Sequence, residues 1–177
     1  MTTNNTTNTP FPLTQANGGT GLTAEKSIIQ IVSSVISRAT YSTSIPFDNT
    51  KPQSSEGSEV GTCTITPKAA SNIIEVYIEL HFVSGTAAAQ AATMALFRDS
   101  GTDAIMTAFG IISATTQGRI FLQMTYRVAA GSTSATTFKL RAGGNNAVTW
   151  YTNAKTDGTQ LWADADETSI YITEIEA

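Results

Sequence analysis

The sequence has little of what catalytic, nucleic-acid-binding and membrane proteins depend on. Cys63 is the one cysteine, which excludes an internal disulfide and fits a protein made in a reducing cytoplasm. Charged residues make up 14% of the chain, and Lys and Arg never form the cluster that phosphate binding requires. No apolar run approaches the ~18 residues of a membrane-spanning helix. We therefore expect no nucleic-acid partner and no membrane insertion.

The N-terminal stretch lacks the apolar residues that a folded core requires. Met1 to Thr9 consists almost entirely of Thr and Asn. The following Pro10 to Leu13 is an extended, proline-stiffened peptide whose apolar side chains are Phe11 and Leu13. Ala16 to Gly21 is a glycine-rich hinge. We predict that residues 1–25 form an extended N-terminal tether and that residues 26–177 form one folded domain.

What the folded part does contain is strand periodicity. From Ile73 to Val83, alternate residues Ile74, Val76, Ile78, Leu80 and Phe82 are apolar and predict one buried face. Arg119 to Val128 repeats the pattern, and so does the run through Phe138, Leu140 and Ala142. Further β-rich runs are Ser27–Ile36, Val60–Thr66, Val148–Tyr151 and Ser169–Ile175. This spacing predicts an all-β, antiparallel, jelly-roll-like β-sandwich.

The secondary structure of one segment is ambiguous. Ala87 to Phe97 contains strong helix formers and is compatible with a short helix. The same residues lie between a Gly-containing loop and an Asp-Ser-Gly turn, as a sandwich strand does. We favour a loop followed by a strand.

Residues that support catalysis are scarce. His81 is the one histidine and lies on the polar side of its predicted strand, where we expect a surface or intersubunit hydrogen bond. We expect Cys63 to be a small buried core residue. The acidic groups, Asp99 with Asp103 and Asp164 to Glu167, fall in turns, where carboxylates are normally solvated. We predict no enzyme activity, no metal site and no cofactor.

Binding is better supplied than catalysis. Two turns, Gly143–Asn146 and Thr156–Gln160, offer Asn145, Asn146 and Asp157 as polar ligand contacts, with Tyr151 as a bordering aromatic ring. Trp150 and Trp162 are alternatives for stacking on a carbohydrate, although we favour the core or a subunit axis for both. The binding residues that we predict are therefore Asn145, Asn146, Tyr151 and Asp157.

Several segments, in order, resemble parts of tail-fibre proteins of tailed bacteriophages. Leu13 to Gly21, LTQANGGTG, resembles the hinge that precedes a distal β domain in such fibres. Ile28–Ser33, Phe47–Gln53, Glu56–Val60, Ile65–Asn72, Ser134–Gly143 and Ser169–Ile175 are similar to successive parts of that domain. The resemblance implies a homotrimeric virion fibre or spike, made in the host cytoplasm, that attaches to a host surface glycan or envelope protein.

The resemblance also implies how the protein is mounted. Phe11 and Leu13 would dock onto another phage structural protein. Because no fibre shaft precedes the domain, a capsid fibre, decoration or adaptor protein is the alternative, and a polysaccharide depolymerase is a second one. Apolar residues on both faces of Ser27–Ile36 independently indicate that one side of the sandwich meets another subunit, which favours the trimer.

Overall fold

The computed structural model describes residues 26–86, 89–113 and 118–177, and within them the chain is built from strands. The predicted tether of residues 1–25, with Phe11 and Leu13, lies outside the described residues. The ten strands are β1 (Ile28–Ile36), β2 (Ala39–Tyr41), β3 (Ser58–Ile65), β4 (Ile73–Ser84), β5 (Gln90–Arg98), β6 (Met106–Ile112), β7 (Arg119–Ala129), β8 (Thr136–Gly144), β9 (Trp150–Thr152) and β10 (Thr168–Ile175). One 3-10 turn, η2, covers Trp162–Asp164.

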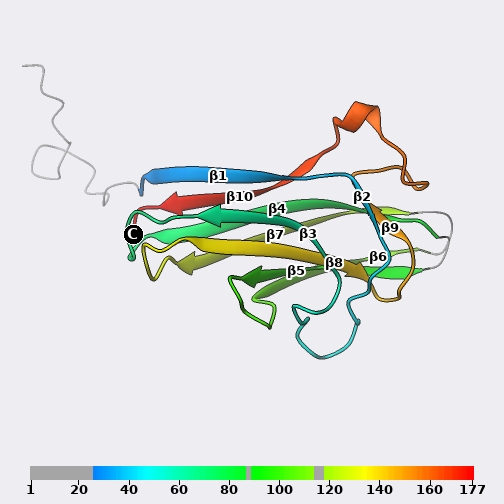
Figure 1. The fold of residues 1–177 in the computed structure, drawn as a ribbon, viewed down its shortest axis with the longest axis horizontal. Helices are drawn as coiled ribbons and strands as arrows, with labels where there is room; N and C mark the ends of the chain where they lie inside the picture. The colour runs from blue at the N-terminus through cyan, green and yellow to red at the C-terminus, as the bar shows by residue number, and fades with distance from the viewer. Residues whose placement is uncertain (1–25, 87–88, 114–117) are drawn as a thin grey trace, which may run out of the picture.

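The strands form two antiparallel sheets that face each other (Figure 1). Sheet A contains β1, β10, β4 and β7 side by side. The short β9 pairs with the last residues of β4, on the same edge as β10, and β2 pairs with β9. Sheet B has the order β3-β8-β5-β6. Four long strands in each sheet make the jelly-roll-like sandwich that the sequence predicted, so the fold class is confirmed.

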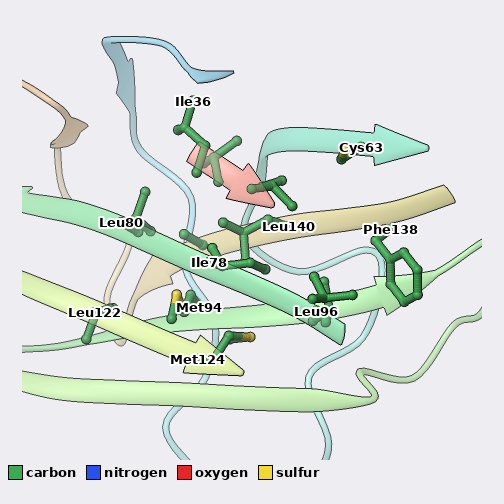
Figure 2. Close-up of a cluster of buried hydrophobic side chains, with 14 of the residues drawn as sticks. Ile36, Cys63, Ile78, Leu80, Met94, Leu96, Leu122, Met124, Phe138 and Leu140 are labelled. Atoms are coloured by element: carbon green, nitrogen blue, oxygen red, sulfur yellow. The ribbon is translucent and has the colours of Figure 1, made fainter. Parts of the chain in front are cut away.

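The core lies between the two sheets and follows the predicted alternation. Ile74, Val76, Ile78, Leu80 and Phe82 are all buried, because successive strand residues point to opposite faces and these five point inward. Leu122 and Met124 of β7 meet them from the neighbouring strand, while Met94, Leu96 and Leu140 come from sheet B (Figure 2). Cys63 is buried in the same cluster, as expected, and burial raises the pKa of its thiol.

The ambiguous segment resolves as a strand. β5 begins at Gln90, so the strand that we favoured over a helix is confirmed, while residues 87 and 88 lie outside the described part of the chain. β5 is buried on both faces, because the 42–57 segment covers the outer side of sheet B and places Ile45 against Ala95 and Phe97. Strand β6 was not predicted, since Phe109 and Ile111 face outward and hide the alternation.

A buried carboxylate fixes the turn between β3 and β4. Glu174 of β10 points inward and accepts hydrogen bonds from the backbone N–H groups of Lys68 and Ala69 and from the side chains of Asn72 and Gln30, at 2.6–3.3 Å. These bonds satisfy a charge that burial alone would make costly. Glu174 therefore ties β10 to two other segments, β1 and the β3–β4 turn, at one end of the sandwich.

Candidate functional site

The first predicted binding loop follows β8. Asn145 accepts a hydrogen bond from the Ala91 backbone N–H through its side-chain oxygen, at 2.9 Å, and its own N–H donates to the Ala91 carbonyl at 2.8 Å. The sequence analysis treated Asn145 as a free ligand contact, whereas the structure gives its side-chain oxygen a backbone partner at the start of β5. Asn146 is exposed at the tip of the turn. Its role in binding stays a prediction.

The second predicted loop lies against the predicted aromatic residue. Asp157 is exposed, and its Oδ1 accepts hydrogen bonds from the N–H and hydroxyl of Thr159, which lower the pKa of the carboxyl. Gly158, with a φ of +80°, lies directly on the ring of Tyr151. Tyr151 and the Asp157 turn are therefore neighbours, because a Cβ at Gly158 would come within 2.6 Å of the tyrosine ring atom Cε1.

The two tryptophans have different environments. Trp150 is fully buried between Tyr41 and Phe82, with ring centroids 4.4 and 4.6 Å away, and its Nε1 donates to the Thr43 carbonyl at 2.9 Å. Its predicted place in the core is confirmed. Trp162, in η2, is 71% exposed and does not contribute to this core.

A polar cluster around half-buried His81 contains one buried carboxylate, that of Asp166. The pKa of His81 is lowered, first by burial and then by the charge of Arg119. Arg119 donates to the Ala154 carbonyl at 2.6 Å and lies 3.9 Å from the buried carboxylate of Asp166. Phe121 covers the histidine ring at 4.9 Å. Through Arg119, these contacts anchor the segment of Ala154 and Asp166 to the start of β7.

The acidic candidates whose side chains are described occupy different environments. Asp99 caps the Thr137 backbone N–H at 2.8 Å, and Asp103 pairs with Gln53 across an isolated bridge. Asp166 is buried and Glu167 is exposed, while the side chain of Asp164 lies outside the described part. Within the residues that the structure describes, no three His, Cys, Asp or Glu side chains gather as a metal site would require.

The most distinctive surface is the outer side of sheet A. Alternation places the following six side chains there, which we call the apolar face: Ile29, Ile31 and Val35 of β1, Tyr171 of β10, Tyr77 of β4 and Phe121 of β7. Five of these are more than 40% exposed. Strand registers align Ser33, Tyr171, Tyr77 and Thr125 in one row across the sheet. Sequence analysis found this face through the two-sided apolarity of β1.

Several polar groups beside the apolar face are paired with one another. Arg127 and Glu75 form an ion pair at 3.1 Å. Tyr77 donates to the Glu79 carboxylate, a bond that raises the pKa of the tyrosine, and Gln123 donates to both groups. A surface whose charges are internally matched is less costly to remove from water than one with unpaired charges.

These features define an all-β sandwich with an exposed apolar sheet face. The chain also matches the family described as the Pgp3 C-terminal domain over residues 47–177, which is more than half of its length. The chain belongs to this family, whose namesake is a chlamydial plasmid-encoded virulence protein.

The family overturns the sequence-based identification. The resemblance to phage tail fibres is wrong, and with it the assignments as a virion fibre that attaches phage to a host, as a capsid fibre or adaptor, and as a phage depolymerase. The assigned location in a virion is wrong for the same reason. Of the segments that carried the resemblance, Leu13 to Gly21 and Ile28 to Ser33 lie outside the matched residues.

The remaining comparisons add little. No protein with a curated description matches the chain. A cryo-EM structure of a virus-like particle of the extra small virus of the giant freshwater prawn Macrobrachium rosenbergii aligns with 96% of this chain and 92% of its own, at 11% identity and a TM-score of 0.21. Likeness at that level carries no argument. No helix in the described residues has the length and apolarity needed to cross a membrane.

Proposed function

We propose that this chain is a non-enzymatic head domain of a virulence protein, and that it works as a homotrimer in which three copies meet through the apolar face. The observation that carries the proposal is the exposure of Ile29, Ile31, Val35, Tyr171 and Phe121 on one side of sheet A. A monomeric domain gains nothing from placing five large apolar side chains in water on one sheet face. The matched polar groups beside them reduce the cost of covering that face.

The distribution of these side chains favours a ring over a two-fold dimer. The aliphatic residues lie on β1 at one edge of sheet A, and the aromatic residues lie on β10, β4 and β7. If the aliphatic edge of one copy packs on the aromatic part of the next, the two copies use different surfaces. Such a heterologous contact repeats around a ring. Three copies form the smallest closed ring that such a contact allows.

A trimer also fits a binding role without catalysis. Each binding site on the domain would occur three times in fixed geometry, so weak contacts to a host macromolecule would add through avidity. The scarcity of catalytic side chains agrees with this role, and no nucleic-acid or membrane partner is needed for it. An assay for hydrolysis of host polysaccharide tests the absence of enzyme activity, and release of saccharide would contradict it.

A matched pair of substitutions tests the surface. Ile31 on the apolar face is 57% exposed, and Ile111 on β6 of the other sheet is 58% exposed. Ile31→Glu places a charge in the subunit contact and should reduce the mass measured by light scattering to that of one chain. Ile111→Glu adds the same charge at equal exposure and should leave the trimer intact. Equal masses for the two variants would refute the proposed contact.

A further inference from the structure

A second surface, on the opposite sheet, has the features of a ligand pocket. A cavity of about 310 Å³ lies between the 46–52 segment and β6. This volume is at the lower limit of the range for small-ligand sites. Phe47 and Phe109 form its aromatic walls, with ring centroids 5.1 Å apart and planes tilted by 55°, and both rings are more than half exposed. Pro46 and Pro52 complete the apolar lining.

The wall of the cavity is held in place by backbone hydrogen bonds. Ile45 donates its N–H to the Gly144 carbonyl, and Ala104 donates to the Pro52 carbonyl, both at 2.9 Å. Ser54 donates to the Thr102 carbonyl at 2.7 Å. The 46–52 segment is therefore anchored on both sides of the cavity, and a ligand would find the site formed in advance.

Two polar side chains in the lining have unused hydrogen-bonding capacity. Thr93 lies opposite Phe109 in the β5–β6 register and is 6% exposed, and its hydroxyl has no partner within the described residues. A buried hydroxyl without a partner is uncommon and costly, which is expected where a ligand supplies the partner. Asp48 uses Oδ1 for both hydrogen bonds from Thr50, and no bond within the described residues uses Oδ2.

The lining chemistry selects the ligand class. Within the described residues the cavity contains one carboxylate, three threonine hydroxyls and no cation, which disfavours phosphate, sulfate and acidic sugars. A pyranose has an apolar face for the phenylalanine rings and hydroxyls for the carboxylate. An acetamide group adds a carbonyl to accept from Thr93 and a methyl group for the prolines.

We infer that this cavity binds an N-acetylhexosamine unit of a glycan, with Phe47 and Phe109 against the sugar, Thr93 donating to the acetamide carbonyl and Asp48 accepting from a hydroxyl. A neighbouring cavity of about 290 Å³ shares Thr50, Pro52 and Thr107 and gives room for a second ring. The inference deepens the proposed binding function by naming a ligand, and the trimer would present the site three times.

Saturation-transfer NMR with N,N′-diacetylchitobiose tests the site on the full chain. We expect saturation of the acetyl methyl protons and a Kd on the order of 1 mM. Cellobiose, the same disaccharide without acetamides, should bind about fivefold more weakly. Equal binding of the two sugars overturns the acetamide assignment, and no transfer from chitobiose at about 20 mM overturns the site.

Three variants locate the binding within the protein. Phe109→Ala should weaken chitobiose binding about tenfold, and Thr93→Val about fivefold. Thr93→Val should not unfold the protein, because its hydroxyl has no partner to lose. Ile111→Ala, two residues from Phe109 at 58% exposure but outside the lining, should leave binding unchanged. Unchanged binding in both Phe109→Ala and Thr93→Val would refute the site.

Light scattering on the same samples separates the two proposals. A trimer that does not bind chitobiose refutes the glycan site and leaves the assembly standing. A monomer that binds it refutes the assembly and leaves the site standing. If Phe109→Ala lowers the mass, the Phe47–Phe109 surface is a subunit contact and not a sugar site. Binding of a proline-rich peptide with no response to either sugar would assign the cavity to a protein partner and overturn the inference.

Discussion

Replacing Glu174 should destabilise the sandwich more than its single position suggests. The two carboxylate oxygens are used unequally: Oε1 accepts from Lys68, Ala69 and Asn72, and Oε2 accepts from Gln30. Glu174→Gln can keep its oxygen at the Oε1 position, so it loses mainly one charge-assisted bond, about 1.5–3 kcal/mol. Glu174→Ala leaves all four donors without their acceptor and should cost about 3–5 kcal/mol.

The pH dependence provides an independent check on the same residue. Burial raises the pKa of Glu174, but the hydrogen bonds from Asn72, Gln30, Lys68 and Ala69 lower it by more, so it lies below the ordinary 4.5. The folded carboxyl therefore binds its proton more weakly than the unfolded one. Its stabilisation is fully present above about pH 4.5 and is lost as the pH falls through the lower folded pKa.

Urea unfolding at fixed protein concentration measures both effects. The free energy of unfolding should fall in the order wild type, Glu174→Gln, Glu174→Ala at pH 7. The gap between wild type and Glu174→Gln should narrow below about pH 4.5. Glu167→Gln, an exposed carboxylate nearby in the chain, should stay within about 0.5 kcal/mol of wild type. If Glu174→Ala lowers the free energy of unfolding by no more than Glu167→Gln does, the stabilising role of the Glu174 hydrogen bonds is refuted.

Three further predictions concern other parts of the sandwich. Asn145→Ala should lower the free energy of unfolding by about 1 kcal/mol, because it removes the bond to the Ala91 N–H; unchanged urea unfolding would leave Asn145 free for a ligand. Gly143→Ala should cost about 1–3 kcal/mol in the same assay, since the new Cβ would lie 2.7 Å from the Ile45 backbone nitrogen; unfolding equal to wild type would contradict this close approach. The lowered pKa of His81, caused by burial and then by Arg119, means that the folded state loses stability as the pH falls below about 6.5. In His81→Gln, the thermal unfolding temperature should therefore depend less on pH in that range than it does in the wild-type protein. An equal pH dependence in the two proteins would exclude His81 as the cause.

The sequence predicted the sheets well because burial acts on alternate residues. The apolar residues from Ile74 to Phe82 alternate with polar ones, so the sequence alone identified the buried face of β4. Several runs of this kind along the chain indicated a sandwich. β6 escaped notice because Phe109 and Ile111 are apolar but point outward, while Gly110 interrupts the inward side. Alternation of apolar and polar residues predicts a strand whose one face is buried in the core. It does not predict a strand whose outward residues are also apolar.

The candidate sites were harder to predict, since they depend on contacts between distant segments. Nothing near Asn145 in the sequence indicates that its side chain pairs with Ala91, and Trp150 and Trp162 have similar local contexts but opposite exposure. The cavity beside Phe47 needs β6, which alternation did not reveal. The family identification failed because glycine-rich hinges such as Ala16 to Gly21 and short β-strand motifs such as Ser169 to Ile175 reflect turn and strand chemistry that unrelated proteins share.

The central claim is that the apolar face of sheet A joins three copies of the chain. Sedimentation equilibrium of the wild-type protein at micromolar concentration measures the assembled mass directly and without reference to shape. Three chains of 18.7 kDa predict a single species of about 56 kDa. A species of 18.7 kDa, or a dimer of twice that mass, would contradict the account.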